Sequence, residues 1–168
     1  LGFYAFVSAA LSIPLLALAF SGLFHRGRAL SPLMADSGFF CLAFGAVLAF
    51  SGAEIGVFRF GMIAASFFCV EGGERGGYFS GALTGFFSGL ALGIEFIPPL
   101  VLGGFLCGAF IRKRRLVGVM LLCAVLAIST LFYGEFIKGA EIFSTAWGCA
   151  LWIAVSELFA DKKRVKMP

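Results

Sequence analysis

The sequence predicts an all-α integral membrane protein, a polytopic bundle of about seven transmembrane helices with a range of six to eight. Three observations lead there. Of the 168 residues, 61% are hydrophobic, only 13% are charged, and mean hydropathy is +1.03. A soluble domain carries ~25% charged residues. The apolar residues also lie in long runs with short polar breaks between them. This composition argues against disorder, nucleic-acid binding and a water-soluble enzyme.

The apolar runs define seven candidate membrane segments. A spanning helix needs ~20 apolar residues, so the first segment and the last two are long enough. The second, third and fifth have only 14 to 16 residues, and we expect them to be half-buried, re-entrant or packed in a thinned bilayer. The seven segments are residues 2–24, 38–51, 55–70, 76–93, 97–111, 116–133 and 140–159.

The breaks between the segments carry the residues that end helices or prefer water. Proline and glycine terminate helices, and charged side chains favour the headgroup region. The breaks lie at residues 25–32, 51–54, 71–77, 95–99, 112–115 and 133–135.

The distribution of Lys and Arg predicts the orientation, because basic residues concentrate in cytoplasmic loops. With the carboxyl end in the cytoplasm, 11 of the 13 basic residues fall on that side. The chain begins at Leu1 without a basic leader, so we interpret residues 1–168 as a single integral membrane domain cut from a longer chain. The cytoplasmic basic loop consists of Arg112, Lys113, Arg114 and Arg115.

Glycine recurs at every fourth residue, and we expect this series, which we call the glycine ladder, to form one stripe along a single helix, the fourth segment. Small residues let two membrane helices approach closely. Three interpretations stay open: packing within the bundle, self-association into a homo-oligomer, or a permeation groove. A second, shorter patch of glycines lies on the next segment. We therefore expect the two segments to form a helical hairpin that turns at residues 95–99. The ladder is Gly73, Gly77, Gly81, Gly85, Gly89 and Gly93, and the patch is Gly103, Gly104 and Gly108.

Arg59 is the one basic residue placed inside a predicted segment, where a charge costs ~2.5–3.5 kcal/mol. We therefore expect it to have an acidic partner, from Glu54, Glu95, Glu135 or Glu141. It forms either a structural ion pair near the outer headgroups or part of a ligand or proton site.

No residue pattern predicts catalysis, a metal or a cofactor. The five cysteines stand singly in apolar runs and are expected to be packed, reduced thiols. The single histidine, His25, adjoins Arg26 in a loop. No serine or cysteine has a plausible base beside it, so the chain is expected not to be an enzyme.

From about residue 61 to 159 the order of features resembles the membrane region of stage II sporulation protein E. The likeness rests on the ladder from Gly77 to Gly89, on the run from Gly104 through Arg115 to Gly118, and on Tyr133-Gly134-Glu135 before a final helix with Glu157. The resemblance implies a bacterial inner-membrane, multi-pass region that precedes a cytoplasmic serine/threonine phosphatase controlling sporulation gene expression. The phosphatase and its metal-binding aspartates are absent from these residues, so no catalytic residue carries over.

We therefore expect a non-catalytic membrane domain that anchors, localises and oligomerises a cytoplasmic phosphatase. Its expected partners are the lipid bilayer and further copies or other membrane proteins, with no nucleic acid and no known small-molecule ligand. The alternative is a small-molecule transporter or a substrate-binding membrane subunit. Arg59 and Glu95 buried together in a polar cavity would favour transport, and an exposed ladder would favour assembly.

Overall fold

The computed structural model describes residues 32–132 and 139–164, and this part of the chain is mostly helical. The first predicted segment, residues 2–24, lies outside the described residues, as do Glu135 and Lys138. The elements in chain order are α2 (Pro32–Phe50), β1 (Glu54–Ile55), β2 (Phe58–Arg59), α3 (Phe60–Leu92), the 3-10 helix η1 (Ile94–Phe96), α4 (Ile97–Phe110), α5 (Arg115–Phe132) and α6 (Gly139–Arg164).

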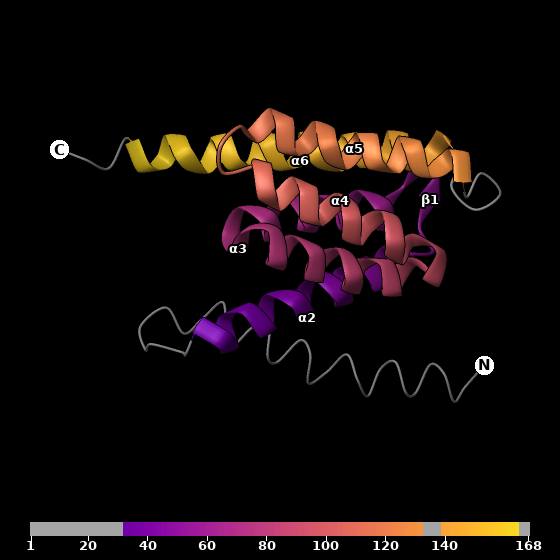
Figure 1. Cartoon of the computed structure of the whole chain (residues 1–168), viewed down its shortest axis with the longest axis horizontal. Coiled ribbons are helices and arrows are strands. Elements are labelled where there is room, and N and C mark those ends of the chain that lie inside the picture. The colour runs from indigo at the N-terminus through magenta and orange to yellow at the C-terminus, as the bar shows by residue number, and fades with distance from the viewer. Residues whose placement is uncertain (1–31, 133–138, 165–168) are drawn as a thin grey trace.

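The helices pack side by side in layers. In Figure 1, α5 and α6 lie along one side of the molecule, α2 lies on the opposite side, and α3 and α4 fill the space between them. The contacts agree with this view, since α3 packs against α2, α4 and α6, and α4 also packs against α5. The two halves of α3 therefore have neighbours on several sides.

Gly77 divides α3 into two helices that run back along each other. Its backbone has φ 75° and ψ −154°, a conformation that only glycine adopts readily. Residues far apart in the sequence meet because of this reversal: a Cβ added to Gly61 would contact the Leu92 side chain, and one added to Gly72 would contact Thr84. The glycine-rich break predicted at residues 71–77 is thus a tight interhelical turn.

A short antiparallel hairpin precedes α3 and replaces the start of the predicted third segment. Glu54 pairs with Arg59 and Ile55 with Phe58, around a two-residue turn in which Gly56 has φ 62°. The helix begins only at Phe60, with Arg59 in extended conformation as its N-cap. The sequence predicts Arg59 inside a membrane segment. In the structure it lies at the start of α3, as the N-cap.

The hairpin of α3 and α4 forms close to the predicted place. Gly93 ends α3 with φ 147°, η1 turns the chain, and α4 starts at Ile97 with two prolines in its first turn. Proline suits that position, because the first N–H groups of a helix have no intrahelical partner. The sequence predicts the turn at residues 95–99, but it lies slightly earlier, at Gly93 and η1, because residues 97–99 already form the first turn of α4.

The predicted fold class, a transmembrane bundle of about seven segments, is wrong. Among the described residues, no helix is both long and apolar enough to cross a membrane. The apolar runs are cut into shorter or more polar pieces. Gly77 divides α3 at a stretch that also contains Glu71, Glu74 and Arg75. The 14 residues of α4 rise only ~21 Å, against ~30 Å for the hydrocarbon core.

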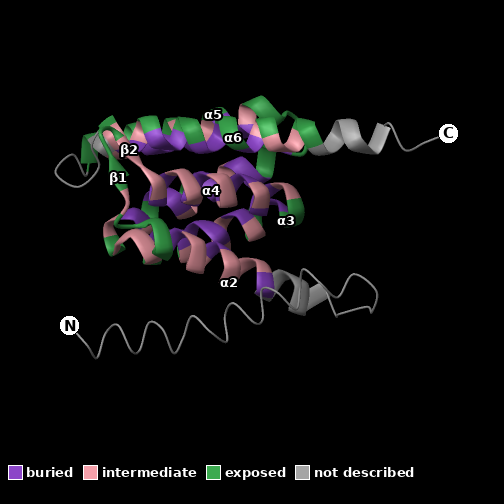
Figure 2. Ribbon diagram, turned by 180° about the vertical axis from the view of Figure 1, so that it is seen from behind, coloured by how far each residue is buried: buried purple, intermediate pink, exposed green. Residues whose placement is uncertain are grey.

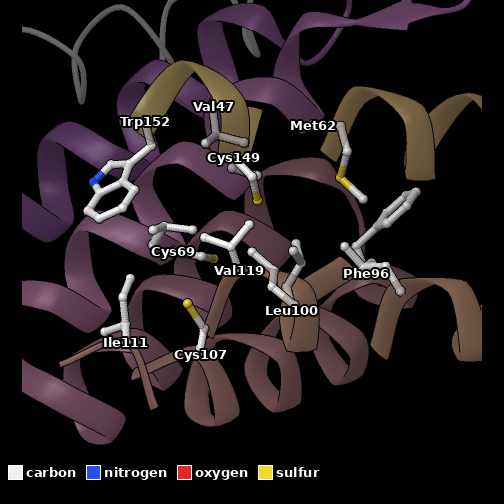
Figure 3. Packing of buried hydrophobic residues seen from close by; sticks show 14 residues of the cluster. Val47, Met62, Cys69, Phe96, Leu100, Cys107, Ile111, Val119, Cys149 and Trp152 are labelled. Carbon is white, nitrogen blue, oxygen red and sulfur yellow. The ribbon is translucent and has the colours of Figure 1, made fainter. Parts of the chain in front are cut away.

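The apolar core lies where α3, α4, α5 and α6 converge, with α2 closing one side. Figure 2 shows buried positions concentrated on the inward faces, and exposed positions on the outer faces of α5 and α6. Figure 3 shows side chains from five helices in this cluster. Its largest member is Trp152, which is 1% exposed. The core thus joins the hairpin of α3 and α4 to the layer of α5 and α6.

Candidate functional site

The second half of α3 packs against α4 through glycine backbones. A Cβ added to Gly81 would overlap the carbonyl oxygen of Gly104, and one added to Gly85 would overlap that of Leu100. A Cβ at Gly89 would lie 2.7 Å from the Ile97 Cα atom. Such distances are inside van der Waals contact, so none of these positions tolerates a side chain without movement of the backbone. This geometry supports the first of the three interpretations, packing within one chain.

The glycine ladder is not one stripe of a single helix, which corrects the sequence interpretation. Gly77 forms the turn, and nothing lies within 4 Å of a Cβ built on it. Gly73 belongs to the preceding helix, although the turn brings it within reach of the Gly108 Cα atom on α4. Gly93 ends α3, where an added Cβ would meet the Glu95 side chain. The four-residue period therefore serves three structural roles.

At one end of the molecule, three charged side chains form what we call the Arg59 cluster: Glu54, Arg59 and Glu141. The guanidinium group of Arg59 pairs with Glu54 Oε1 at 3.0 Å and also with Glu141 Oε1. The strand pairing brings Glu54 opposite Arg59, and α6 supplies Glu141. The Glu141 side chain is only 1% exposed, so its negative charge depends on pairing within the protein.

A backbone contact strengthens the link between the Arg59 cluster and α6. The backbone N–H of Arg59 donates a hydrogen bond to Ser144 Oγ at 2.9 Å. Ser144 Oγ donates in turn to the carbonyl oxygen of Val57 at 3.3 Å. Two consecutive turns of α6 therefore hold the start of α3.

A small cavity lies beside the Arg59 cluster. Its volume is about 60 Å³, and it is lined by Ser51, Glu54, Arg59, Gly61, Met62, Leu92, Phe96 and Glu141. Pockets for metabolites typically measure ~300–1,000 Å³, so this one has room for water but not for a metabolite. Among the described residues, Glu95 forms no ion pair and does not line the cavity.

At the other end of the first half of α3, a second group of side chains forms what we call the Trp152 cluster: Glu71, Arg75 and Trp152. The indole N–H of Trp152 donates to Glu71 Oε2 at 2.9 Å. The other oxygen of Glu71 accepts from Arg75 Nε at 2.6 Å, one helical turn away. No pattern in the sequence predicts this cluster, because Glu71 and Trp152 lie 81 residues apart.

Two residues of the basic loop, residues 112–115, contact the end of the helix that precedes Gly77. Arg112 donates to the carbonyl oxygens of Glu74 at 3.3 Å and Arg75 at 2.6 Å. Arg115 pairs with Glu74 at 3.0 Å and with Glu157 at 3.7 Å. Its guanidinium carbon also lies 5.9 Å from the centroid of the Trp152 ring. These contacts join α3, α5 and α6 at this end.

Ion pairs, hydrogen bonds and cation–π contacts link the described side chains of the two clusters and the basic loop. The cysteines at positions 41, 69, 107, 123 and 149 are free thiols. In residues 32–132 and 139–164, no group of three His, Cys, Asp or Glu side chains could hold a metal ion.

Comparison of the chain with protein-family models, with curated proteins and with solved structures finds no match. The resemblance to stage II sporulation protein E therefore depends on the residues quoted for it, and it stays a prediction.

Proposed function

We propose that this chain is a non-catalytic, membrane-associated helical domain that anchors a linked effector at a bacterial membrane. The observation that carries the proposal is the separation of two polar clusters by an apolar exterior. The Arg59 and Trp152 clusters lie at opposite ends of the first half of α3. Twelve residues separate Arg59 from Glu71, which corresponds to ~18 Å of helix.

The apolar exterior is large for a protein surrounded by water. Within the described part of the chain, twenty-one large hydrophobic side chains are exposed, including Met120 at 68%, Ile128 at 55% and Trp147 at 49%. Most of them lie on α3, α4, α5 and α6, and the others lie on α2, the β-hairpin and η1. Extended apolar surface on a folded protein typically contacts lipid or another protein. The low content of charged residues, 13%, favours lipid.

The anchoring role is compatible with the packing of the described residues. The cavity beside Arg59 is too small for a metabolite, and the glycine ladder is occupied by α4. The transporter alternative required Arg59 and Glu95 together in a polar cavity, and these two residues do not meet there. If the anchored effector is a phosphatase, as the resemblance implies, the gene will encode it beyond Pro168.

Fractionation of bacterial cells that express the chain tests membrane association. We expect the protein to sediment with the membranes and to stay there after a high-salt wash, because contact through apolar side chains does not depend on charge. Recovery in the supernatant before or after the wash would contradict the proposal.

A double substitution tests the role of the apolar exterior. Met120→Gln with Ile128→Gln exchanges two exposed apolar side chains for polar ones. Burying such a side chain contributes ~1.5–3 kcal/mol, so binding to phosphatidylcholine vesicles should weaken by more than about tenfold. Circular dichroism of the variant should match that of the unchanged protein. If vesicle binding stays equal, lipid does not cover this face.

A further inference from the structure

We propose that Lys113 and Arg114 form a contact site for anionic phospholipid headgroups, an inference that rests on the proposed membrane association. The four residues of the basic loop form two pairs, one bound to other parts of the protein and one exposed. Arg112 and Arg115 are engaged with residues of α3 and α6. Lys113 and Arg114 are exposed, and among the described residues neither forms an ion pair.

The charge balance of the two ends supports an anionic partner at this one. Around the basic loop the described residues include five basic side chains, at positions 75 and 112–115, and three acidic ones, Glu71, Glu74 and Glu157, for a net charge of +2. Around Arg59 there is one basic side chain against Glu54, Glu95 and Glu141, for a net charge of −2. A surface of negative lipid attracts the first end and repels the second.

Helix α5 adds to the positive potential. It begins at Arg115, directly after Arg114, so its first N–H groups have no carbonyl partner within the helix. The dipole of the helix places partial positive charge at this end. Headgroup phosphates near Lys113 and Arg114 would meet both the side-chain charges and this potential.

The neighbours of the basic loop favour lipid over an acidic protein. Exposed apolar side chains flank it on both sides: Phe110 is 45% exposed and Leu116 is 67% exposed. At the adjoining turn, Tyr78 is 58% and Phe79 is 66% exposed. Basic side chains beside exposed aromatic and aliphatic ones are typical of surfaces that insert between lipid headgroups.

Vesicle flotation tests the site, with the full chain diluted from mild detergent. One set of vesicles is phosphatidylcholine alone, and the other contains equal parts of phosphatidylcholine and phosphatidylglycerol. The measured quantity is the ratio of the two partition coefficients. Each basic residue near an anionic surface contributes ~1 kcal/mol, or about fivefold in binding. Lys113→Gln with Arg114→Gln should therefore lower the ratio by about 20- to 30-fold.

The matched control exchanges the two residues while it keeps their charge: Lys113→Arg with Arg114→Lys should preserve the ratio. Because neither side chain makes an ion pair within the described protein, both variants should unfold at the same denaturant concentration as the unchanged chain. High salt should reduce the ratio for the unchanged chain, since it screens exposed charges.

The outcomes separate this inference from the proposed function. If the chain binds neither set of vesicles, membrane association itself fails. If it binds phosphatidylcholine but the Gln variant keeps the full ratio, membrane association stands and the lipid site at Lys113 and Arg114 is overturned. Binding of a soluble polyglutamate peptide, lost in the Gln variant, without any preference for phosphatidylglycerol would assign the loop to an acidic protein and also overturn the proposal.

Discussion

Gly81 on α3 and Gly104 on α4 face each other so closely that a Cβ on either residue would overlap the carbonyl oxygen of the other. The contact is reciprocal, so the two helices meet backbone to backbone at this level. Between apolar helices, such an approach gains packing contacts that larger side chains would prevent. The close approach of α3 and α4 at this level therefore depends on the absence of side-chain atoms at both positions.

Gly85→Ala should destabilise the protein even though alanine favours helix formation. The added Cβ would lie inside contact distance of the Leu100 carbonyl group and of the Val101 nitrogen, which are backbone atoms that cannot rotate away. Overpacking of this kind typically costs ~1–3 kcal/mol in the free energy of unfolding. Denaturant unfolding in detergent measures the change.

Gly45→Ala is the matched control for that substitution. Gly45 lies in α2, and nothing is within 4 Å of a Cβ built on it. The gain in helix propensity, up to ~1 kcal/mol, should therefore appear as increased stability. Equal effects at positions 45 and 85 would mean that α3 and α4 do not pack through their glycines.

Arg59→Gln should lower the free energy of unfolding by about 3 kcal/mol, because it leaves the buried Glu141 carboxylate without its guanidinium partner. Glu54→Gln should cost less than about 1 kcal/mol, since the Glu54 side chain is 53% exposed and water replaces the pair.

A double-mutant cycle isolates the pair of Arg59 and Glu141. The variant with both Arg59→Gln and Glu141→Gln should lose less stability than the two single changes added together, by ~1–3 kcal/mol. Strict additivity of the two changes would show that the pair makes no net contribution to stability.

Gly77→Ala should destabilise the protein by ~1–3 kcal/mol for a conformational reason. The space around Gly77 is open, but its backbone has φ 75° and ψ −154°, which an alanine adopts only with strain. Gly139→Ala is the control, because an added Cβ there also has open space and Gly139 has no positive φ. Unfolding measurements that find equal stability for the two variants would contradict a sharp reversal at Gly77.

Cys107 should resist alkylation in the folded protein, because burial raises the pKa of its thiol to about 12. At pH 8 about one molecule in 10,000 then carries the reactive thiolate. Burial likewise raises the pKa of Cys69. Mass spectrometry after treatment with iodoacetamide at pH 8 should find both thiols unmodified until denaturant is added, and half-buried Cys41 modified earlier. Rapid labelling of Cys107 in the native state would refute its burial.

The sequence predicted the bounds of α4 and α5 closely, because Pro98, Pro99 and the basic loop interrupt the apolar runs clearly, but α2 begins earlier and α6 ends later than predicted. It also predicted a break at residues 71–77, but not that the chain reverses at Gly77 itself, which was placed inside the predicted fourth segment. A period of four residues continues through positions 73, 77 and 81 whether or not the helix does. The membrane-spanning assignment failed for a related reason, since hydropathy counts apolar residues without regard to how the backbone divides them.

The charged residues were harder to place than the helices. Glu54 and Glu141 were among the acids considered for Arg59, but the strand pairing that sets Glu54 opposite Arg59 spans only two residues on each side. The hydrogen bond between Trp152 and Glu71 joins residues 81 positions apart, and no local sequence pattern predicts such a partner. A charged residue that needs a partner can thus be recognised in the sequence more readily than the partner itself.

The two clusters that link α3 to α6 have matched spacing. Twelve residues separate Arg59 from Glu71 along α3, and eleven separate Glu141 from Trp152 along α6. Between them, Gly148 of α6 lies against Ser66 and the Ile63 carbonyl oxygen of α3. A slide of α6 by one turn, ~5.4 Å, would break both links at once and force a larger residue into the Gly148 contact. We therefore expect α6 and the first half of α3 to move together along their axes, because contacts near both ends and at Gly148 link them.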